Sequence, residues 1–124
     1  MDRMTIVYLV LGFALYTFIN NLKSLAERQR SVSIYTDPDE LHNIALRSTN
    51  KYYRMNVARN RAARVDTLIA LSKDPYWCAR SVVASRKDCP REILEVLKND
   101  SHFDVRRSAE QSLNGEFEDY IYIN

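Results

Sequence analysis

Residues 64–113 read RVDTLIALSKDPYWCARSVVASRKDCPREILEVLKNDSHFDVRRSAEQSL, and within this stretch the chain repeats itself. Asp74 and Asp100 are 26 positions apart, and three neighbouring pairs match at the same step: Leu68 with Leu94, Leu71 with Leu97, and Arg80 with Arg106. A third copy lies earlier in the chain at the same step. Its residues Ser48, Arg54, Val57 and Ala58 stand 26 positions before Asp74, Arg80, Val83 and Ala84. A fixed period of this length indicates supersecondary units that bury their apolar faces on one another, about three being the minimum. We therefore predict an array of helical repeats.

The composition of the chain supports continuous helices. Its 124 residues leave room for one modest domain, and they include only two glycines and three prolines, which argues against turn-rich β structure. The net charge of +2 is too small to indicate a class of partner. The fold expected is all-α: a short α-solenoid of about three helix pairs at residues 37–113, preceded by a long N-terminal hydrophobic helix.

Each repeat unit carries signals for where its helices begin. Asp37-Pro38 reads as an N-cap followed by proline at the first helical position. The residues predicted to cap the second helices of the three units are Ser48, Asp74 and Asp100. Gly115 is predicted to end the array. The residues predicted to face inward include Leu41, Val57, Val65, Leu68, Ile69, Leu94, Phe103 and Val105.

These residues give the chain a resemblance to a known family. The segments LIALSKDPYWCARSVVAS and CPREILEVLKNDSHFDVRRSAEQ are similar to the leucine-rich repeat variant group of α-helical solenoids, relatives in style of HEAT repeats. The shared pattern is a leucine pair, an Asp, a small apolar residue followed by Arg, and a Pro that opens the next unit. The resemblance implies a right-handed stack of helix pairs with a concave face, and it implies no activity.

The N-terminal region begins with an uncharged apolar stretch, MTIVYLVLGFALYTFI, at residues 4–19. A membrane-spanning helix needs about 20 apolar residues and at least about 17, so residues 1–30 are predicted to hold one span with a juxtamembrane extension. The alternative is a core or oligomer-interface helix of a soluble protein. A cleaved signal peptide fits less well, because no small-x-small site follows the stretch. Residues 31–36 are predicted to form a linker.

The flanks and one face of this helix lead to two further expectations. The basic residues that follow the apolar stretch are Lys23, Arg28 and Arg30, whereas Arg3 precedes it beside an acidic residue. The positive-inside tendency therefore places the C-terminal domain in the cytoplasm. A stripe of small or weakly polar residues favours packing between membrane helices, and the candidates for self-association as a homo-oligomer are Tyr8, Gly12 and Tyr16.

Arginines recur at one position of all three units, and a basic run with tyrosines lies at residues 51–64. The recurring arginines are suited to phosphates or acidic peptide. The basic run is suited to nucleic acid, lipid headgroups or an acidic protein surface, with an ordinary solvated helix as the alternative. The candidate partner-binding residues are Lys51, Arg54, Arg59, Arg61, Arg64, Arg80 and Arg106. The structural alternative is that Arg80 and Arg106 each tie their own unit together by bonding the carboxylate of its capping Asp or a helix end. Arg54 aligns with Ser48 rather than an Asp, so its charge is expected to lack that partner.

The sequence gives little support for chemistry. His42 and His102 lie in different units, and the two glycines do not form a phosphate-binding loop. Cys78 and Cys89 show no metal-site spacing and are expected to be reduced thiols, with a bridge between them as the alternative. We predict no catalytic residue, no metal and no cofactor. The acidic, aromatic tail at residues 114–124 is expected to cover the exposed end of the last unit, with a disordered recognition segment as the alternative.

Taken together, these patterns predict a non-catalytic protein that is anchored in a membrane by one span and binds a protein partner, or acts as a scaffold, on the cytoplasmic side. The alternative is a nucleic acid-binding repeat protein that uses the basic run at residues 51–64. In that case the N-terminal helix lies in an oligomer interface instead of a bilayer.

Overall fold

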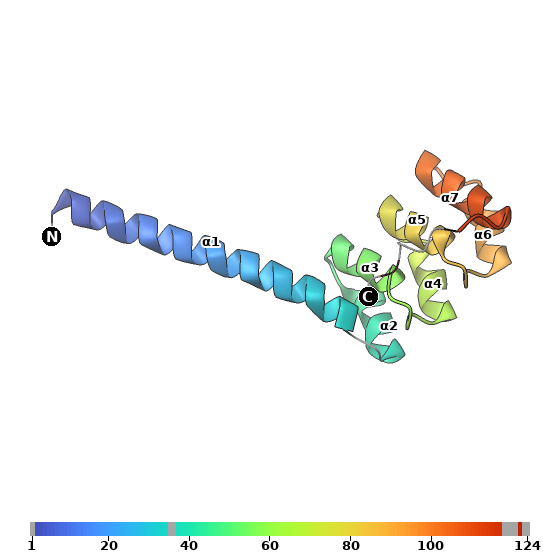
Figure 1. The fold of residues 1–124 in the computed structure, drawn as a ribbon, viewed down its shortest axis with the longest axis horizontal. Helices are drawn as coiled ribbons and strands as arrows, with labels where there is room; N and C mark the ends of the chain where they lie inside the picture. Colours follow the sequence, from blue (N-terminus) through green and yellow to red (C-terminus); the bar gives the residue numbers. More distant parts are fainter. Residues whose placement is uncertain (1, 35–36, 118–121, 123–124) are drawn as a thin grey trace. The chain divides into compact units, whose positions relative to one another are not determined.

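The computed structural model describes residues 2–34, 37–117 and 122, with the side chains of the first helix described through residue 23. Within these residues the chain is all-α, with seven helices (Figure 1). It divides into two units, residues 1–31 and residues 32–124, and each is described by itself.

The first unit is formed by α1, which runs from Arg3 to Ile34, so that the last three residues of the helix fall within the second unit. Asp2 caps its start, because the Asp2 carboxylate accepts a hydrogen bond of 2.8 Å from the backbone N–H of Thr5. The helix continues to Ile34, so four residues of the expected linker are helical, and residues 35–36 lie outside the described part. Good helix formers such as Leu25, Ala26 and Glu27 favour this continuation.

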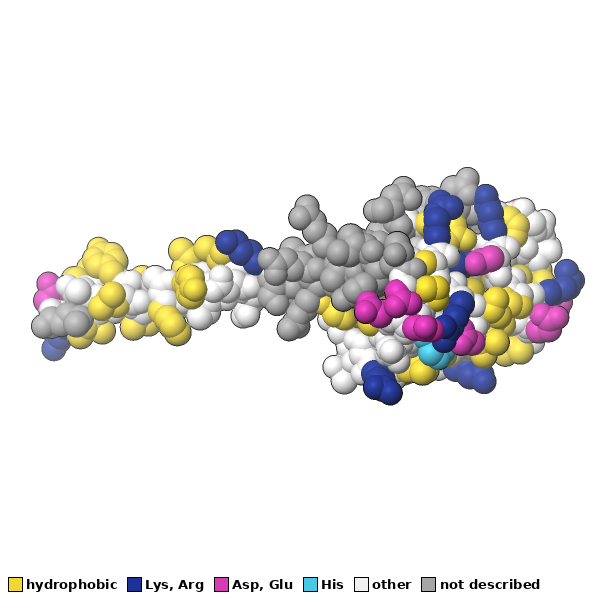
Figure 2. All heavy atoms as spheres, turned by 90° about the horizontal axis from the view of Figure 1, so that it is seen from below, with side chains coloured by type: hydrophobic (Ala, Val, Ile, Leu, Met, Phe, Trp, Pro, Cys, Tyr) yellow, Lys and Arg dark blue, Asp and Glu magenta, His cyan; other side chains and the backbone are white. Residues whose placement is uncertain are grey.

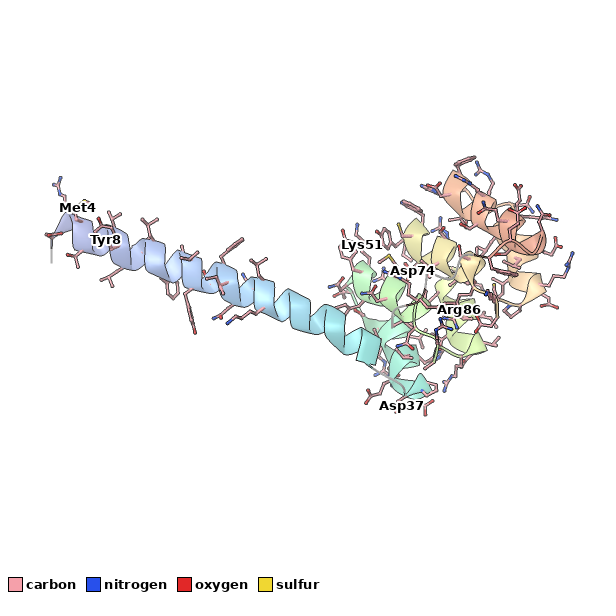
Figure 3. All side chains as sticks on the ribbon, viewed as in Figure 1. Met4, Tyr8, Asp37, Lys51, Asp74 and Arg86 are labelled. Atoms are coloured by element: carbon pink, nitrogen blue, oxygen red, sulfur yellow. The ribbon has the colours of Figure 1, made fainter. Side chains whose placement is uncertain are left out.

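One segment of α1, Arg3–Lys23, is 21 residues long and apolar enough to cross a membrane or to act as a signal sequence. At 1.5 Å per residue this segment is about 32 Å long, close to the ~30 Å of a bilayer's hydrocarbon core. Its side chains project outward around the helix (Figure 3), and none of the segment is buried in protein. The prediction of a long apolar N-terminal helix is confirmed.

The second unit contains six shorter helices. Their bounds are α2 Pro38–Arg47, α3 Lys51–Ala58, α4 Val65–Leu71, α5 Trp77–Ser85, α6 Arg91–Leu97 and α7 Phe103–Leu113. Helix α2 contacts α3 and α4, α5 contacts both α3 and α7, and α6 packs on α7. The second helices of successive sequence repeats therefore lie side by side, α3 beside α5 and α5 beside α7 (Figure 1).

The buried side chains form one hydrophobic cluster through these six helices. Leucines at repeated positions, such as Leu68, Leu71, Leu94 and Leu97, are all buried, as predicted. Three residues predicted to face inward are instead exposed: Val65, Ile69 and Phe103. Helix α4 is only seven residues long, and Thr67, Leu68 and Leu71 already fill its buried face.

The helix ends confirm two of the predicted signals. The Asp37 carboxylate accepts a hydrogen bond from the N–H of Asp39, with Pro38 in the first turn of α2. Gly115 follows α7 with a φ of +78°, which glycine adopts readily. The N–H groups of Gly115 and Glu116 donate to the carbonyls of Ser112 and Gln111, which is the Schellman arrangement that ends many helices.

The predicted caps of the second helices are wrong by two residues. The N-caps of α3, α5 and α7 are Asn50, Tyr76 and His102, each two positions after the residue expected from sequence. Ser48, Asp74 and Asp100 instead form the turn before the helix. Each side chain accepts a hydrogen bond from the N–H two residues later, at 3.2, 2.8 and 2.8 Å.

Candidate functional site: the repeated arginines

Two of the three repeated arginines join one repeat unit to the next. The guanidinium of Arg54 donates from Nε and Nη2 to both carboxylate oxygens of Asp74, at 2.6 and 3.3 Å. Arg80 holds Asp100 in the same way, at 2.8 and 3.0 Å. In both cases the carboxylate is 20 residues further along the chain. These are bidentate pairs, which fix geometry more strongly than a single hydrogen bond.

The same arginines also hold their own units. Nη1 of Arg54, Arg80 and Arg106 donates to the backbone carbonyl six residues earlier, at 2.8, 2.7 and 2.7 Å. Those carbonyls belong to Ser48, Asp74 and Asp100. Each arginine therefore closes its own turn, and Arg54 and Arg80 also reach the turn of the next unit. We call this set the arginine ladder.

Two expectations about the arginine ladder are corrected by this geometry. Arg54 does not lack a carboxylate, because its partner is Asp74 of the following unit. The structural alternative is correct in part: Arg80 and Arg106 each bond the predicted capping residue of their own unit, but through its backbone carbonyl and not its carboxylate. In the folded chain Asp74 is 4% exposed and Asp100 is 10% exposed, so both pairs are largely shielded from water.

The pKa of Asp100 reports two opposed effects. Burial alone raises the pKa of a carboxyl, but the hydrogen bonds from Arg80 and from the N–H of His102 outweigh it and hold the pKa of Asp100 below its ordinary value. Asp100 is therefore ionised at neutral pH, and its charge is matched by the guanidinium of Arg80.

A second set of bonds between units was missed by the sequence analysis. Arg86 is 1% exposed and lies at the turn after α5 (Figure 3). Its Nη1 donates to the carbonyls of Ala58 and Asn60 in the preceding unit, at 2.8 and 2.6 Å. Its Nε and Nη2 donate to both carboxylate oxygens of Asp88, each at 2.7 Å. These bonds hold the pKa of Asp88 below its ordinary value against the opposing effect of burial.

Ser112 occupies the position of Arg86 one unit later, and it makes the equivalent bond. Its hydroxyl donates to the carbonyl of Ala84 at 2.5 Å, 28 residues earlier, the same separation as between Arg86 and Ala58. A spacing of 26 residues between Asn60, Arg86 and Ser112 is present in the sequence. The residue types differ, however, so the spacing alone does not reveal the shared role.

The basic run at residues 51–64 is less uniformly positive than its sequence indicates. Besides Arg54, Arg64 is bonded to carboxylates: its Nε donates to Asp66 at 2.6 Å and its Nη1 contacts Asp39. Hydrogen bonds to Asp66 and Asp39 raise the pKa of Arg64. Basic and acidic side chains also lie close together on the face of this unit that Figure 2 shows.

The other candidates in this run contact aromatic rings or further groups. Nζ of Lys51 lies 4.8 Å from the centre of the Tyr76 ring, a cation–π geometry. The guanidinium carbon of Arg61 lies 4.3 Å from the centre of the Tyr122 ring. Arg59 is partly buried and also interacts with other groups of the chain.

Tyr122 is the residue near the end of the tail that the structure describes. Its ring lies against Arg61 and Arg86, at the turns after α3 and α5, beside a depression of about 280 Å³ that these residues line with Lys87 and Asp88. The tail was expected to cover the end of the last unit, but Tyr122 contacts the two earlier turns. Residues 118–121 and 123–124 lie outside the described residues.

Histidine and cysteine side chains have structural contacts. Nδ1 of His42 lies 2.8 Å from the hydroxyl of Thr67, and the His102 ring stacks on Trp77 with 4.0 Å between centres. Cys78 and Cys89 are free thiols. Burial raises the pKa of Cys89 to about 12, so its thiol is protonated and unreactive at neutral pH. In the described ranges, no group of three or more potential His, Cys, Asp or Glu ligands is placed to hold a metal.

The candidates for helix self-association lie on the exposed surface of α1. Tyr8 and Tyr16 are 66% and 64% exposed, and a Cβ added at Gly12 would meet no atom within 4 Å. Nothing in the first unit therefore covers this face, and its pairing with a second helix stays a prediction.

No protein-family model matches the chain, and neither a curated protein nor a solved structure matches it. The resemblance to leucine-rich repeat variants thus stays a prediction from the residues that carry it.

Proposed function

We propose that this chain is a single-pass membrane protein whose helical unit binds a protein partner on the cytoplasmic side. The observation that carries the proposal is the exposed apolar segment of α1. Between Met4 and Leu22 its large hydrophobic side chains are 41–70% exposed, and a helix that is apolar all round is stable when lipid or protein covers it. The length of the segment suits a bilayer.

We further propose that the six shorter helices form a right-handed α-solenoid of three helix pairs. Two observations support this arrangement. The inter-unit bonds of Arg54 and Arg80 are separated by 26 residues and have the same geometry. In addition, α3, α5 and α7 pack in succession, as expected when each unit contacts its neighbours. The residues similar to leucine-rich repeat variants lie in the second and third sequence repeats.

Protein binding is the function that such an array supports best, because stacked helix pairs present an extended surface to a partner. Nucleic acid binding through residues 51–64 is the alternative. Because Arg54 and Arg64 are bonded to carboxylates, the run offers less positive potential to phosphates than its composition indicates. We therefore favour a protein partner.

Membrane fractionation tests the anchor. We expect the full chain to sediment with membranes after lysis without detergent and to resist extraction at alkaline pH. A variant carrying both Val10→Arg and Ala14→Arg should become soluble, because each arginine at the centre of a span costs about 2.5–3.5 kcal/mol on insertion scales. The matched control is Val96→Arg, at a residue that is 72% exposed in the second unit, and it should stay in the membrane fraction.

Labelling of cysteine tests the orientation, because both cysteines lie within residues 32–124. A membrane-impermeant maleimide should label the partly exposed Cys78 only after the cells are permeabilised, if this unit is cytoplasmic. Intact mass spectrometry should show α1 still attached. A chain that is soluble without detergent, or that has lost α1 by cleavage, would contradict the anchor. Labelling of Cys78 in intact cells would show that the helical unit lies outside the cytoplasm, which is the opposite orientation.

A further inference from the structure

Two side chains of α7 are the sequence equivalents of two side chains of α5 that contact the following repeat. Arg106 and Phe103 stand 26 positions after Arg80 and Trp77. On α5, Arg80 binds the carboxylate of Asp100, and the Trp77 ring stacks on His102 at an interplanar angle of 4°. One turn of the next unit, residues 100–102, therefore satisfies both side chains of α5.

On α7 the same two side chains are not covered in this way. Phe103 is 63% exposed, and the guanidinium of Arg106 lies 6.0 Å from the centre of its ring. Nη1 of Arg106 bonds the carbonyl of Asp100, as its counterparts bond theirs. In the ranges 2–34 and 37–117 and at Tyr122, no carboxylate is placed as Asp100 is for Arg80.

From this comparison we infer that Arg106 and Phe103 form a docking site for a partner protein that presents an aspartate in a turn leading into a helix. The aspartate carboxylate takes the place that Asp100 has on Arg80. A flat side chain two residues later covers Phe103 as His102 covers Trp77. The chain itself supplies the template for this ligand in residues 100–102. The inference rests on the proposed protein-binding function and names the chemistry of the partner.

A second copy of the chain fits the site less well than a different protein. Suppose that a second copy stacked its first sequence repeat on α7. The positions of Asp100 and His102 would then be filled by Ser48 and Asn50, which are their equivalents two repeats earlier. Ser48 carries no carboxylate for Arg106, and Asn50 carries no ring for Phe103. Charge complementarity therefore favours a partner with an acidic turn.

The acidic tail of the chain is also less suitable. Tyr122 lies against Arg61 and Arg86, which follow the C-terminal ends of α3 and α5. Arg106, by contrast, is in the first turn of α7, seven residues or about 10 Å before the end of that helix. Tyr122, the one described residue near the end of the tail, thus lies near the C-terminal ends of α3 and α5, whereas Arg106 lies near the N-terminal end of α7.

A titration with a peptide tests the site. The probe is a fluorescein-labelled peptide with the sequence of residues 98–113, KNDSHFDVRRSAEQSL, which presents the Asp100 turn and its helix. Fluorescence anisotropy is measured with the full chain in detergent micelles. We expect saturable binding that Arg106→Glu weakens at least tenfold. Arg107→Glu, the same charge change at the exposed neighbouring residue, should change the affinity less than twofold.

Changes in the probe and at Phe103 separate docking from a loss of folding. A peptide carrying Asp100→Asn should bind at least tenfold more weakly to the unchanged chain, which leaves the fold of the protein intact. Phe103→Ala, at an exposed ring, should weaken binding about fivefold with unchanged circular dichroism. Absence of saturable binding, or equal effects of Arg106→Glu and Arg107→Glu, would overturn the inference.

The tail is tested as the competing occupant. A chain carrying Glu116→Gln, Glu118→Gln and Asp119→Asn should bind the peptide with unchanged affinity. A tenfold gain in affinity would show that the tail occupies the site and would overturn the proposal of a partner. Peptide binding in micelles does not depend on whether α1 spans a bilayer, so failure of the anchor in fractionation and failure of this site are separate results.

Discussion

Replacing Arg86 by alanine is expected to lower the free energy of unfolding of the helical unit by about 3–5 kcal/mol. Arg86 is the largest fully buried side chain among the described residues, and its loss leaves the carbonyls of Ala58 and Asn60 without this donor. A buried polar group without a partner costs about 1–3 kcal/mol, and the volume vacated by the side chain adds the cost of a cavity. Urea unfolding followed by the fluorescence of Trp77, the single tryptophan, measures the change.

The control for Arg86 is Arg91→Ala. Arg91 is 74% exposed, and its contact is an ion pair with Glu95 at 3.6 Å on the surface of α6. Its removal should change the free energy of unfolding by less than about 0.5 kcal/mol. If Arg86→Ala were no more destabilising than Arg91→Ala, the buried bonds between units would not hold the fold together.

The second large effect is expected at the pair of Arg80 and Asp100. Breaking a fully buried ion pair costs about 3–5 kcal/mol. Because these side chains are 14% and 10% exposed, we expect about 2–3 kcal/mol for Arg80→Ala or Asp100→Ala. A double-mutant cycle should give a coupling energy of more than about 1 kcal/mol. The exposed pair Arg91 and Glu95 should give about 0.3–0.5 kcal/mol in a matched cycle.

The coupling between Arg80 and Asp100 should depend on pH in one direction. The folded-state pKa of Asp100 is lowered, so the pair contributes fully above the unfolded-state pKa of about 3.9. Its contribution is lost as the pH falls through the lower folded-state value. Repeating the cycle near pH 7 and below about pH 3 should show the coupling shrink at acidic pH. A coupling energy that is equal at both values would contradict the bidentate pair.

The sequence predicts the helical elements of this protein better than it predicts their polar contacts. The apolar positions around Leu68 and Leu94 recur at a fixed step, and Gly115 has a conformational role that its type indicates. These features depend on residues close in sequence, and all of them are found in the structure. The long apolar helix at the N-terminus was predicted for the same reason.

Contacts between units depend on distances that the sequence pattern does not contain. Arg54 was expected to lack a carboxylate because Ser48 stands six residues before it, yet Asp74 approaches from the next unit. Arg86 sits in the polar segment SRKD and reads as a surface residue. Only the fold shows that it reaches the carbonyls of Ala58 and Asn60. Such residues are found by comparing the bonds at equivalent positions of the units in the folded chain, as for Arg86 and Ser112.

Phe103 was predicted to face inward because it belongs to the apolar pattern of its helix; its counterpart one unit earlier is Trp77. Trp77 is partly buried against the core and also stacks on His102 of the following unit, and no described residue stacks on Phe103 in that way. The same reasoning distinguishes Arg106 from Arg54 and Arg80. Position within the unit thus fixes what a side chain binds, whereas position along the array fixes whether the binding group is present.

The most direct measurement is NMR of the arginine side chains in the full chain, through the exchange of each Nε–H proton with water. We expect slow exchange for Arg54 and Arg80, whose Nε–H groups donate to Asp74 and Asp100, and fast exchange for Arg106. Adding the peptide of residues 98–113 should slow the exchange of Arg106. Equal exchange rates for all three arginines in the free protein would contradict the ladder of two occupied positions and one that is open to a partner.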